Sequence, residues 1–226
     1  MLSVFDLLEA GTLDLDMAAR LMARITRGAS FMVGALPGGA GKTTVMCALL
    51  NLAPADCALA AATPEVVRAA SRRPPARRTC FICHEIGAGH WFAYLWGDDL
   101  RRYCALRDQG HLLATNLHAD YIEEARAQVV EENRVPESHF AGFELLLFLR
   151  VGGGFGQRRR TVEPVYQSSG GGHQLVFDAS GQAAASFQVD EDWCARCRGF
   201  LETQYENGCR TIEDTRARVL EFLSAG

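Results

Sequence analysis

The residues with the clearest chemistry form a glycine-rich segment, LPGGAGKTT, at positions 36–44. Its ending follows the pattern G-x-x-x-x-G-K-[ST], in which glycines let backbone N–H groups turn toward phosphate oxygens. In that pattern Lys42 reaches the β- and γ-phosphates and the Thr43 hydroxyl holds Mg²⁺. The pattern therefore predicts binding of ATP and Mg²⁺ by Pro37, Gly38, Gly39, Ala40, Gly41, Lys42, Thr43 and Thr44.

Two further observations bear on this prediction. The chain has 23 Lys plus Arg residues, and Lys42 is its one lysine. This supports a phosphate loop, because the planar fork of arginine does not replace a compact ammonium there. Leu36 stands where the pattern has its first glycine. We expect its side chain either to narrow the loop or to point into the core.

Hydrolysis of a nucleotide also needs a carboxylate at the end of a neighbouring strand, where it positions water or holds the metal. Glu85 ends the apolar segment TCFICHEI and is the first candidate, with Mg²⁺ contacted directly or through water. Asp98 and Asp99 follow the run WFAYLWG and are the rivals. A third interpretation makes Glu85 a surface carboxylate that follows a buried strand.

Polar residues also follow a short apolar run in the segment GHLLATNLHAD, at positions 110–120. Side chains at such a strand end can contact a γ-phosphate or a bound water molecule. The candidates are His111, Thr115, Asn116 and His118. The alternative is that the histidines are structural.

The elements that must position these residues alternate between strand and helix. The expected helices are two short ones within 3–27, interrupted at 11–12, and others at 42–52, 65–71, 98–107 and 120–132. The expected strands are 31–35, 57–62, 79–86 and 111–115, and 90–96 is a further apolar, aromatic run. This alternation predicts an α/β core with a mostly parallel sheet.

The pattern changes after residue 143. Three expected strands, 143–151, 159–167 and 174–177, are separated by glycine-rich turns at 152–156 and 170–172, which predicts an antiparallel meander. Residues 192–225 read as helical. We divide the chain into N-terminal helices (1–30), a core with the strand extension (31–190) and a C-terminal helical segment (191–226).

Composition limits the class of protein. The chain has 226 residues, is 48% hydrophobic and carries a net charge of −4. It has no apolar run of about 20 residues, as a membrane-spanning helix requires, and no basic and apolar leader. A cytoplasmic protein without direct nucleic-acid binding is expected. The one basic cluster is a solvated loop, or supplies an arginine finger to a neighbouring subunit: Arg68, Arg72, Arg73, Arg77 and Arg78.

The eight cysteines include two C-x-x-C pairs. Cys80 and Cys83 lie within an expected strand, where they would face opposite sides, so buried free thiols are the favoured interpretation. Cys194 and Cys197 lie in a polar helical region. They are either free thiols or, with Cys209, ligands of a metal ion.

Together these motifs resemble the secretion ATPases of type II and type IV systems and of type IV pili. LPGGAGKTT is similar to the GPTGSGKTT of that family, and GHLLATNLHA resembles its histidine box, with His111 and His118 as the two histidines. Residues 5–35 look like the stretch that leads into the loop. Residues 143–167 are similar to a late strand pair with an arginine-containing hairpin. The family's acidic box is not recognisable, and the spacing from Glu85 to His111 is longer than usual.

The resemblance implies a RecA-like fold, Mg²⁺-dependent ATP hydrolysis and a homo-oligomer, usually a hexameric ring. It also implies docking on a membrane platform protein, with the chain peripheral to the inner face of the membrane at most. By the same resemblance Lys42 and Thr43 bind phosphate and magnesium, Glu85 is the catalytic acid, and His118 couples nucleotide state to ring movement. A nucleotide-dependent regulatory or assembly protein with little hydrolysis is the alternative. A P-loop kinase, with the arginines of 68–78 as its lid, is the third.

Overall fold

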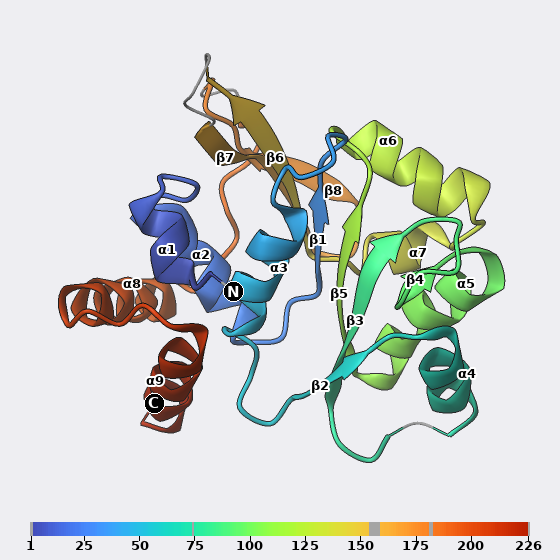
Figure 1. The fold of residues 1–226 in the computed structure, drawn as a ribbon, viewed down its shortest axis with the longest axis horizontal. Coiled ribbons are helices and arrows are strands. Elements are labelled where there is room, and N and C mark those ends of the chain that lie inside the picture. Colours follow the sequence, from blue (N-terminus) through green and yellow to red (C-terminus); the bar gives the residue numbers. More distant parts are fainter. Residues whose placement is uncertain (1, 74, 154–158, 181–182, 226) are drawn as a thin grey trace.

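An eight-stranded sheet forms the centre of the computed structural model, which describes residues 2–73, 75–153, 159–180 and 183–225 (Figure 1). The strand order is β2-β3-β5-β1-β6-β7-β8, and β4 extends the edge beside β3. The strands are β1 (Phe31–Gly34), β2 (Ala58–Ala61), β3 (Thr79–Ile86), β4 (Tyr94–Leu95), β5 (Leu112–Leu117), β6 (Leu145–Gly152), β7 (Arg159–Ser168) and β8 (His173–Phe177). The strands from β1 to β6 run parallel, and β7 and β8 run antiparallel to their neighbours.

Helices cover both faces of the sheet (Figure 1). One face carries α1 (Val4–Glu9), α2 (Leu15–Ile25), α3 (Lys42–Leu50), α8 (Glu191–Glu206) and α9 (Ile212–Ser224). The other carries α4 (Pro64–Arg72), α5 (Gly97–Ala105), η1 (Leu106–Gln109), α6 (Ile122–Arg126), η2 (Ala127–Glu132) and α7 (Glu137–Phe140).

The central strand β1 shows why the sequence specifies this layered arrangement. All four of its residues are buried, with parallel strands on both sides. Phe31 and Val33 belong to the core beneath α3, whereas Met32 belongs to the core on the opposite face. Because a strand exposes successive side chains to opposite faces, a continuous apolar run marks a strand that is covered on both sides.

The predicted α/β class, with a parallel sheet, an antiparallel extension and C-terminal helices, is confirmed. The predicted strand 79–86 coincides with β3. In the run 90–96, only Tyr94–Leu95 is strand. The helix expected at 120–132 begins at Ile122 and continues as a π-helical turn, and α7 was not predicted. The expected turn at 152–156 lies in part outside the described residues.

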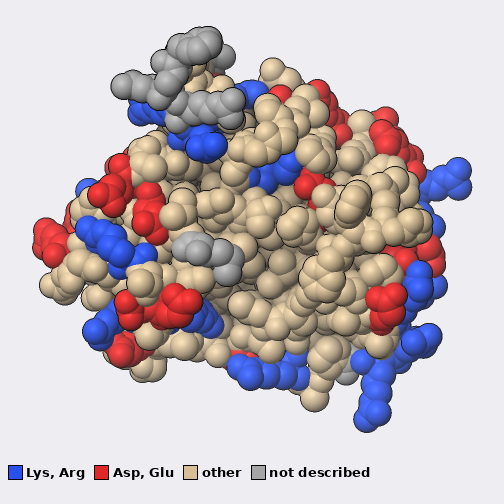
Figure 2. Space-filling model, viewed as in Figure 1, with Lys and Arg blue, Asp and Glu red and all other residues tan. Residues whose placement is uncertain are grey.

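Charged side chains of both signs lie around the rim of the face in Figure 2, and many of them are paired. Basic side chains gather at the lower right of that view, over α4. No helix in the described part of the chain combines the length and apolar character needed to cross a bilayer.

The strand directions determine where polar residues can meet. Gly34 at the end of β1 pairs with Leu117 at the end of β5, and Leu117 also pairs with Ile86 of β3. The carboxyl ends of these three parallel strands therefore lie at one edge of the sheet. In open α/β sheets this is the edge at which ligands bind.

Candidate functional site

The glycine-rich segment connects β1 to α3, and Lys42 is the first residue of that helix. Gly39 and Gly41 have φ values of 74° and 106°, in a region that favours glycine. Gly41 is the N-cap of α3 and makes no side-chain cap bond. The first amides of the helix are thus left to bind another acceptor, and the dipole at a helix N-terminus favours an anion.

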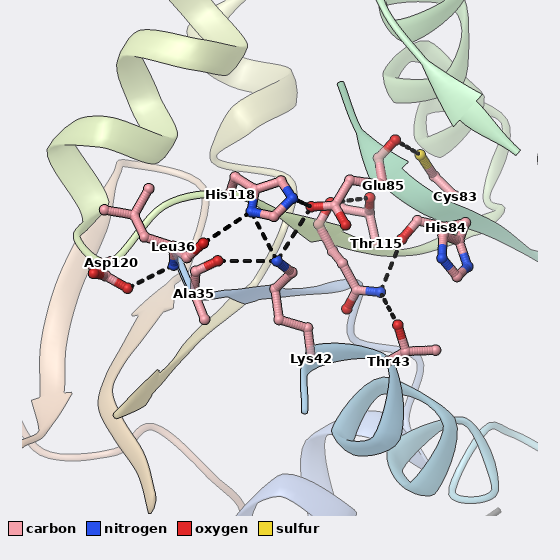
Figure 3. Close-up of polar contacts among 11 residues, drawn as sticks. Ala35, Leu36, Lys42, Thr43, Cys83, His84, Glu85, Thr115, His118 and Asp120 are labelled. Atoms are coloured by element: carbon pink, nitrogen blue, oxygen red, sulfur yellow. Dashed lines mark hydrogen bonds and ion pairs between the residues drawn. The ribbon is translucent and has the colours of Figure 1, made fainter. Parts of the chain in front are cut away.

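Lys42 lies among acceptors from three parts of the chain (Figure 3). Its Nζ donates to the Ala35 carbonyl oxygen at 3.0 Å and lies 3.2 Å from His118 Nδ1 and 3.5 Å from Glu85 Oε1. The side chain is buried, and burial lowers the pKa of Lys42, while the nearby Glu85 carboxylate opposes that shift. The ammonium is therefore held at the carboxyl edge of the sheet.

Glu85 comes from the end of β3 and is only 6% exposed. Its Oε1 lies 3.5 Å from both Lys42 Nζ and His118 Nε2, yet it makes no hydrogen bond within the described residues. A buried carboxylate oxygen without a hydrogen bond costs free energy. This atom is therefore suited to accept from a water molecule or to contact a cation.

Asn116 of β5 links the neighbouring elements. Its Nδ2 donates to the His84 carbonyl oxygen at 2.9 Å and to Thr43 Oγ1 at 3.4 Å, while its buried Oδ1 has no partner in the described residues. Thr115, the preceding residue, is fully buried, and its hydroxyl donates to the Asn116 carbonyl oxygen. Of these two polar residues of β5, only Asn116 reaches the phosphate loop.

Leu36 and Asp120 form an outer layer of contacts. The Leu36 amide donates to Asp120 Oδ1 at 2.8 Å, and its carbonyl oxygen lies 3.3 Å from His118 Nδ1 (Figure 3). The Leu36 side chain is 48% exposed. The expectation that it points into the core is therefore wrong, because it belongs to neither apolar core. Its backbone, by contrast, connects the loop to the segment after β5.

A hollow of about 410 Å³ lies against the loop. It is lined by Gly38, Gly39, Ala40, Gly41, Lys42, Thr43, Thr44, Glu85 and His118. The structure thus brings the predicted loop residues, Glu85 and His118 into one concave site. The other candidates do not line it: Pro37, His111, Thr115 and Asn116.

His111 lies at the other edge of the sheet. Its buried ring packs edge-on against Phe81, and its Nδ1 accepts a hydrogen bond from the Thr79 amide at 3.3 Å. Burial lowers the pKa of His111. His118 is seven positions further along extended chain, about 23 Å away at the usual rise per residue. The expected pairing of the two histidines in one site is contradicted by this geometry.

The rival carboxylates are also outside the site. Asp98 pairs with Arg101 and Arg102 on α5, and Asp99 accepts two hydrogen bonds from Arg68 of α4. Neither aspartate lines the hollow. Of the three candidates, only Glu85 lies beside Lys42.

The other members of the arginine cluster lie far from the loop in the same chain. Arg77 and Arg78 immediately precede Thr79 at the start of β3, whereas Glu85 is near the end of that strand. Arg77 donates to the Asp56 carbonyl oxygen, and Arg78 lies 3.9 Å from the Asp56 carboxylate. A lid formed by this cluster over its own phosphate loop is therefore contradicted.

The cysteines of the two C-x-x-C pairs lie in the apolar cores. Cys80 and Cys83 belong to the apolar cores on opposite faces of the sheet, as predicted, and both are free thiols. Cys194 and Cys197 are buried on α8, and burial raises the pKa of both, that of Cys197 to about 12. No cluster of three or more His, Cys, Asp or Glu suited to a metal ion occurs in the described residues.

Sequence reasoning missed Arg160 and Asp120. Arg160 is the second residue of β7. Its guanidinium donates to the carbonyl oxygens of Gly39 and Ala40 in the loop. The available signal was the RRR run at 158–160, but the sequence does not show which arginine reaches the loop. Asp120 was assigned only to a helix, although it caps the Leu36 amide.

Comparison with known proteins adds evidence about the fold. No family model and no curated protein sequence matches the chain. Among solved structures, the chain is similar to the VirB11 ATPase of the Brucella suis type IV secretion system in complex with sulphate. The TM-score is 0.50 at 20% identity, over 72% of this chain and 54% of that one. A second similar structure is the ATPase DotB of Yersinia pseudotuberculosis, with a TM-score of 0.50 at 9% identity, over 96% and 62% of the two chains.

The chain therefore spans little more than half the length of these two proteins. At such identities the likeness concerns the fold alone, and the predicted fold class is confirmed at that level.

Proposed function

We propose that this chain is a Mg²⁺-dependent ATPase that holds the nucleotide phosphates in the loop at 36–44 and hydrolyses ATP beside Glu85. The observation that carries the proposal is the convergence of Lys42, Glu85 and His118. They come from three separate elements, and Glu85 Oε1 lies 3.5 Å from the nitrogen atoms of both other residues. The similarity in fold to known ATPases supports it.

The residues beside the loop fit a magnesium ion. Mg²⁺ prefers oxygen ligands, and the site offers the Thr43 hydroxyl and the Glu85 carboxylate, whose buried Oε1 lacks a hydrogen bond in the described residues. We assign these two residues to the ion, with Glu85 acting directly or through water. When bound, the ion neutralises charge on the phosphate oxygens.

The chain's own groups would then act as follows. The ammonium of Lys42 donates to β- and γ-phosphate oxygens in place of the Ala35 carbonyl. The Glu85 carboxylate accepts a hydrogen bond from the attacking water and orients it. His118 contacts both Lys42 and Glu85, and it lies two positions before Asp120 in the chain. A displacement of His118 on loss of the γ-phosphate would therefore be passed to the hydrogen bond between the Leu36 amide and Asp120. We propose this route for coupling hydrolysis to movement.

The larger assembly is also part of the proposal. By the likeness in fold, we propose a homo-oligomeric, hexameric ring that docks on a membrane platform protein of a secretion or pilus system. In that setting the chain is cytoplasmic, peripheral to the membrane at most, and does not bind nucleic acid directly. Titration calorimetry and light scattering with Mg²⁺-ATP test nucleotide binding and ring formation separately.

One observation favours a second candidate, a nucleotide-dependent regulatory or assembly protein with little hydrolysis. Within the described residues Glu85 is the only carboxylate that lines the hollow. The residue beside Thr43 is the neutral Asn116 and not an acid. Glu85 would therefore supply the one negative charge that both holds magnesium and orients water. Tight Mg²⁺-ATP binding without turnover under any condition would favour this candidate.

The discriminating experiment compares two substitutions. We expect Lys42→Ala to weaken Mg²⁺-ATP binding roughly 100-fold, because charge-assisted hydrogen bonds to phosphate are lost. We expect Glu85→Gln to retain binding and to lower the hydrolysis rate roughly 1,000-fold, because the group that orients water is removed.

Asp98→Asn is the matched control, since it makes the same carboxylate-to-amide change outside the hollow. It should leave both quantities unchanged. Equal nucleotide affinity in the wild type and Lys42→Ala would refute the phosphate-loop assignment.

A further inference from the structure

Arg160 contacts the phosphate loop from a strand 120 residues further along the chain. It is the second residue of β7 and pairs with Val151 of β6. Its Nε donates to the Ala40 carbonyl oxygen at 3.0 Å, and its Nη2 donates to the Gly39 carbonyl oxygen at 3.3 Å. Its Cδ lies 3.4 Å from the position that a Cβ on Gly41 would take. The side chain therefore lies against three consecutive residues of the loop.

These two bonds restrain successive peptide groups. A trans peptide is planar, with its C=O and N–H pointing to opposite sides. The bond from Arg160 to the Ala40 carbonyl therefore directs the N–H of Gly41 away from the guanidinium. The bond to the Gly39 carbonyl acts likewise on the N–H of Ala40, which donates to the Pro37 carbonyl oxygen at 3.3 Å. Arg160 thus acts on the turn that arranges the loop amides.

The charge of Arg160 also bears on the site. No carboxylate lies within ion-pair distance of its guanidinium in the described residues, whereas Arg24 and Arg68 each have one and Arg126 has two. A guanidinium has five N–H donors, and the two carbonyls use two of them. The positive charge beside the loop is therefore not compensated by an acidic side chain among those residues.

We propose that Arg160 is a positioning residue that holds the peptide groups of 39–41 in the arrangement that binds phosphate. This inference rests on the proposed function, because its effect on Mg²⁺-ATP affinity can be measured only if the loop binds the nucleotide. The two-pronged geometry, rather than charge alone, is what the proposal requires of the side chain.

The test compares Arg160→Ala, Arg160→Lys and Arg159→Ala in the full chain. Arg159 is the matched control, because it precedes Arg160 in β7 and is exposed. We expect Arg160→Ala to weaken Mg²⁺-ATP binding about 10-fold in titration calorimetry. Arg160→Lys should remain weakened, because a point charge does not replace a planar fork. Arg159→Ala should match the wild type.

A second readout needs no nucleotide. Without Arg160 the turn that protects the Ala40 amide loosens, so its hydrogen exchange should be about 10-fold faster in Arg160→Ala, measured by NMR. The thermal unfolding midpoint should be unchanged, which separates positioning of the loop from general destabilisation.

The outcomes are distinct. Wild-type affinity for Mg²⁺-ATP in Arg160→Lys would show that charge alone suffices. A loss of affinity in Arg159→Ala equal to that in Arg160→Ala would show a general charge effect. Either result overturns the proposal, as does an unchanged rate of hydrogen exchange at the Ala40 amide in Arg160→Ala. If the wild type itself fails to bind Mg²⁺-ATP, the proposed function fails. The exchange measurement still decides whether Arg160 orders the loop.

Discussion

The two ends of β5 carry similar residues in different environments. His111 precedes the strand and His118 follows it. His111 accepts a hydrogen bond from the Thr79 amide within the core, whereas His118 is half exposed and contacts Lys42 and Glu85. The seven-residue spacing that makes the histidines look like a pair places them at opposite edges of the sheet.

The difference shows that strand direction, more than residue type, determines which polar groups can act together. At the carboxyl edge, the loop after β1, the end of β3 and the segment after β5 converge. At the amino edge, the neighbours of His111 are the Thr79 amide and the ring of Phe81. A histidine at the first edge can take part in chemistry, and one at the second contributes to stability.

The sharpest test of this comparison is the removal of His118. We expect His118→Ala to lower the ATP hydrolysis rate roughly 100-fold, because the side chain that contacts both Lys42 and Glu85 is lost. Steady-state release of phosphate measures the effect, and the free energy of unfolding should change little. If hydrolysis by this variant equals that of the wild type, the two edges do not differ in function as we describe.

The complementary change is at His111. We expect His111→Ala to lower the free energy of unfolding by about 1–2 kcal/mol, because the buried Thr79 amide loses its acceptor. Urea denaturation measures this quantity. Nucleotide affinity and the hydrolysis rate should match the wild type, and a loss of either at constant stability would place His111 in the site after all.

A smaller effect concerns pH. Burial lowers the pKa of both His111 and His173, so in the folded state both bind a proton less readily than in the unfolded state. The unfolded chain therefore binds more protons below about pH 6.5, and the free energy of unfolding should fall as the pH is lowered from there. At pH 8 this contribution to stability is fully present.

The pH effect can be divided between the two histidines by measuring the free energy of unfolding from pH 8 to pH 5. His111→Ala should make the decrease shallower, and the share due to His173 should remain. An identical slope in this variant and the wild type would contradict the burial argument for His111.

The smallest effect is expected at Leu36. Leu36→Gly restores the glycine of the loop pattern, but the side chain faces solvent and both contacts to Asp120 and His118 come from the backbone. We expect nucleotide affinity to change by no more than about twofold, as for most exposed positions. A larger gain in titration calorimetry would show that the leucine obstructs the loop.

Some features of this protein depend only on residues that are close together along the chain. The glycines that need positive φ, the lysine that begins α3 and the buried strand before it follow one another along the chain. The loop, the strand–loop–helix unit and the α/β class could therefore be predicted. Glu85 could be predicted as the catalytic carboxylate because it ends an apolar strand, but the sequence did not exclude Asp98 or Asp99 from that role.

Which side chains meet depends on how the elements pack in the folded chain. This packing separates His111 from His118, turns Leu36 to solvent, and brings Arg160 against the loop from the β6–β7 hairpin. The physical reason is that such contacts depend on strand order and direction. These arise from packing both faces of the sheet at once, whereas spacing along the chain constrains only each element.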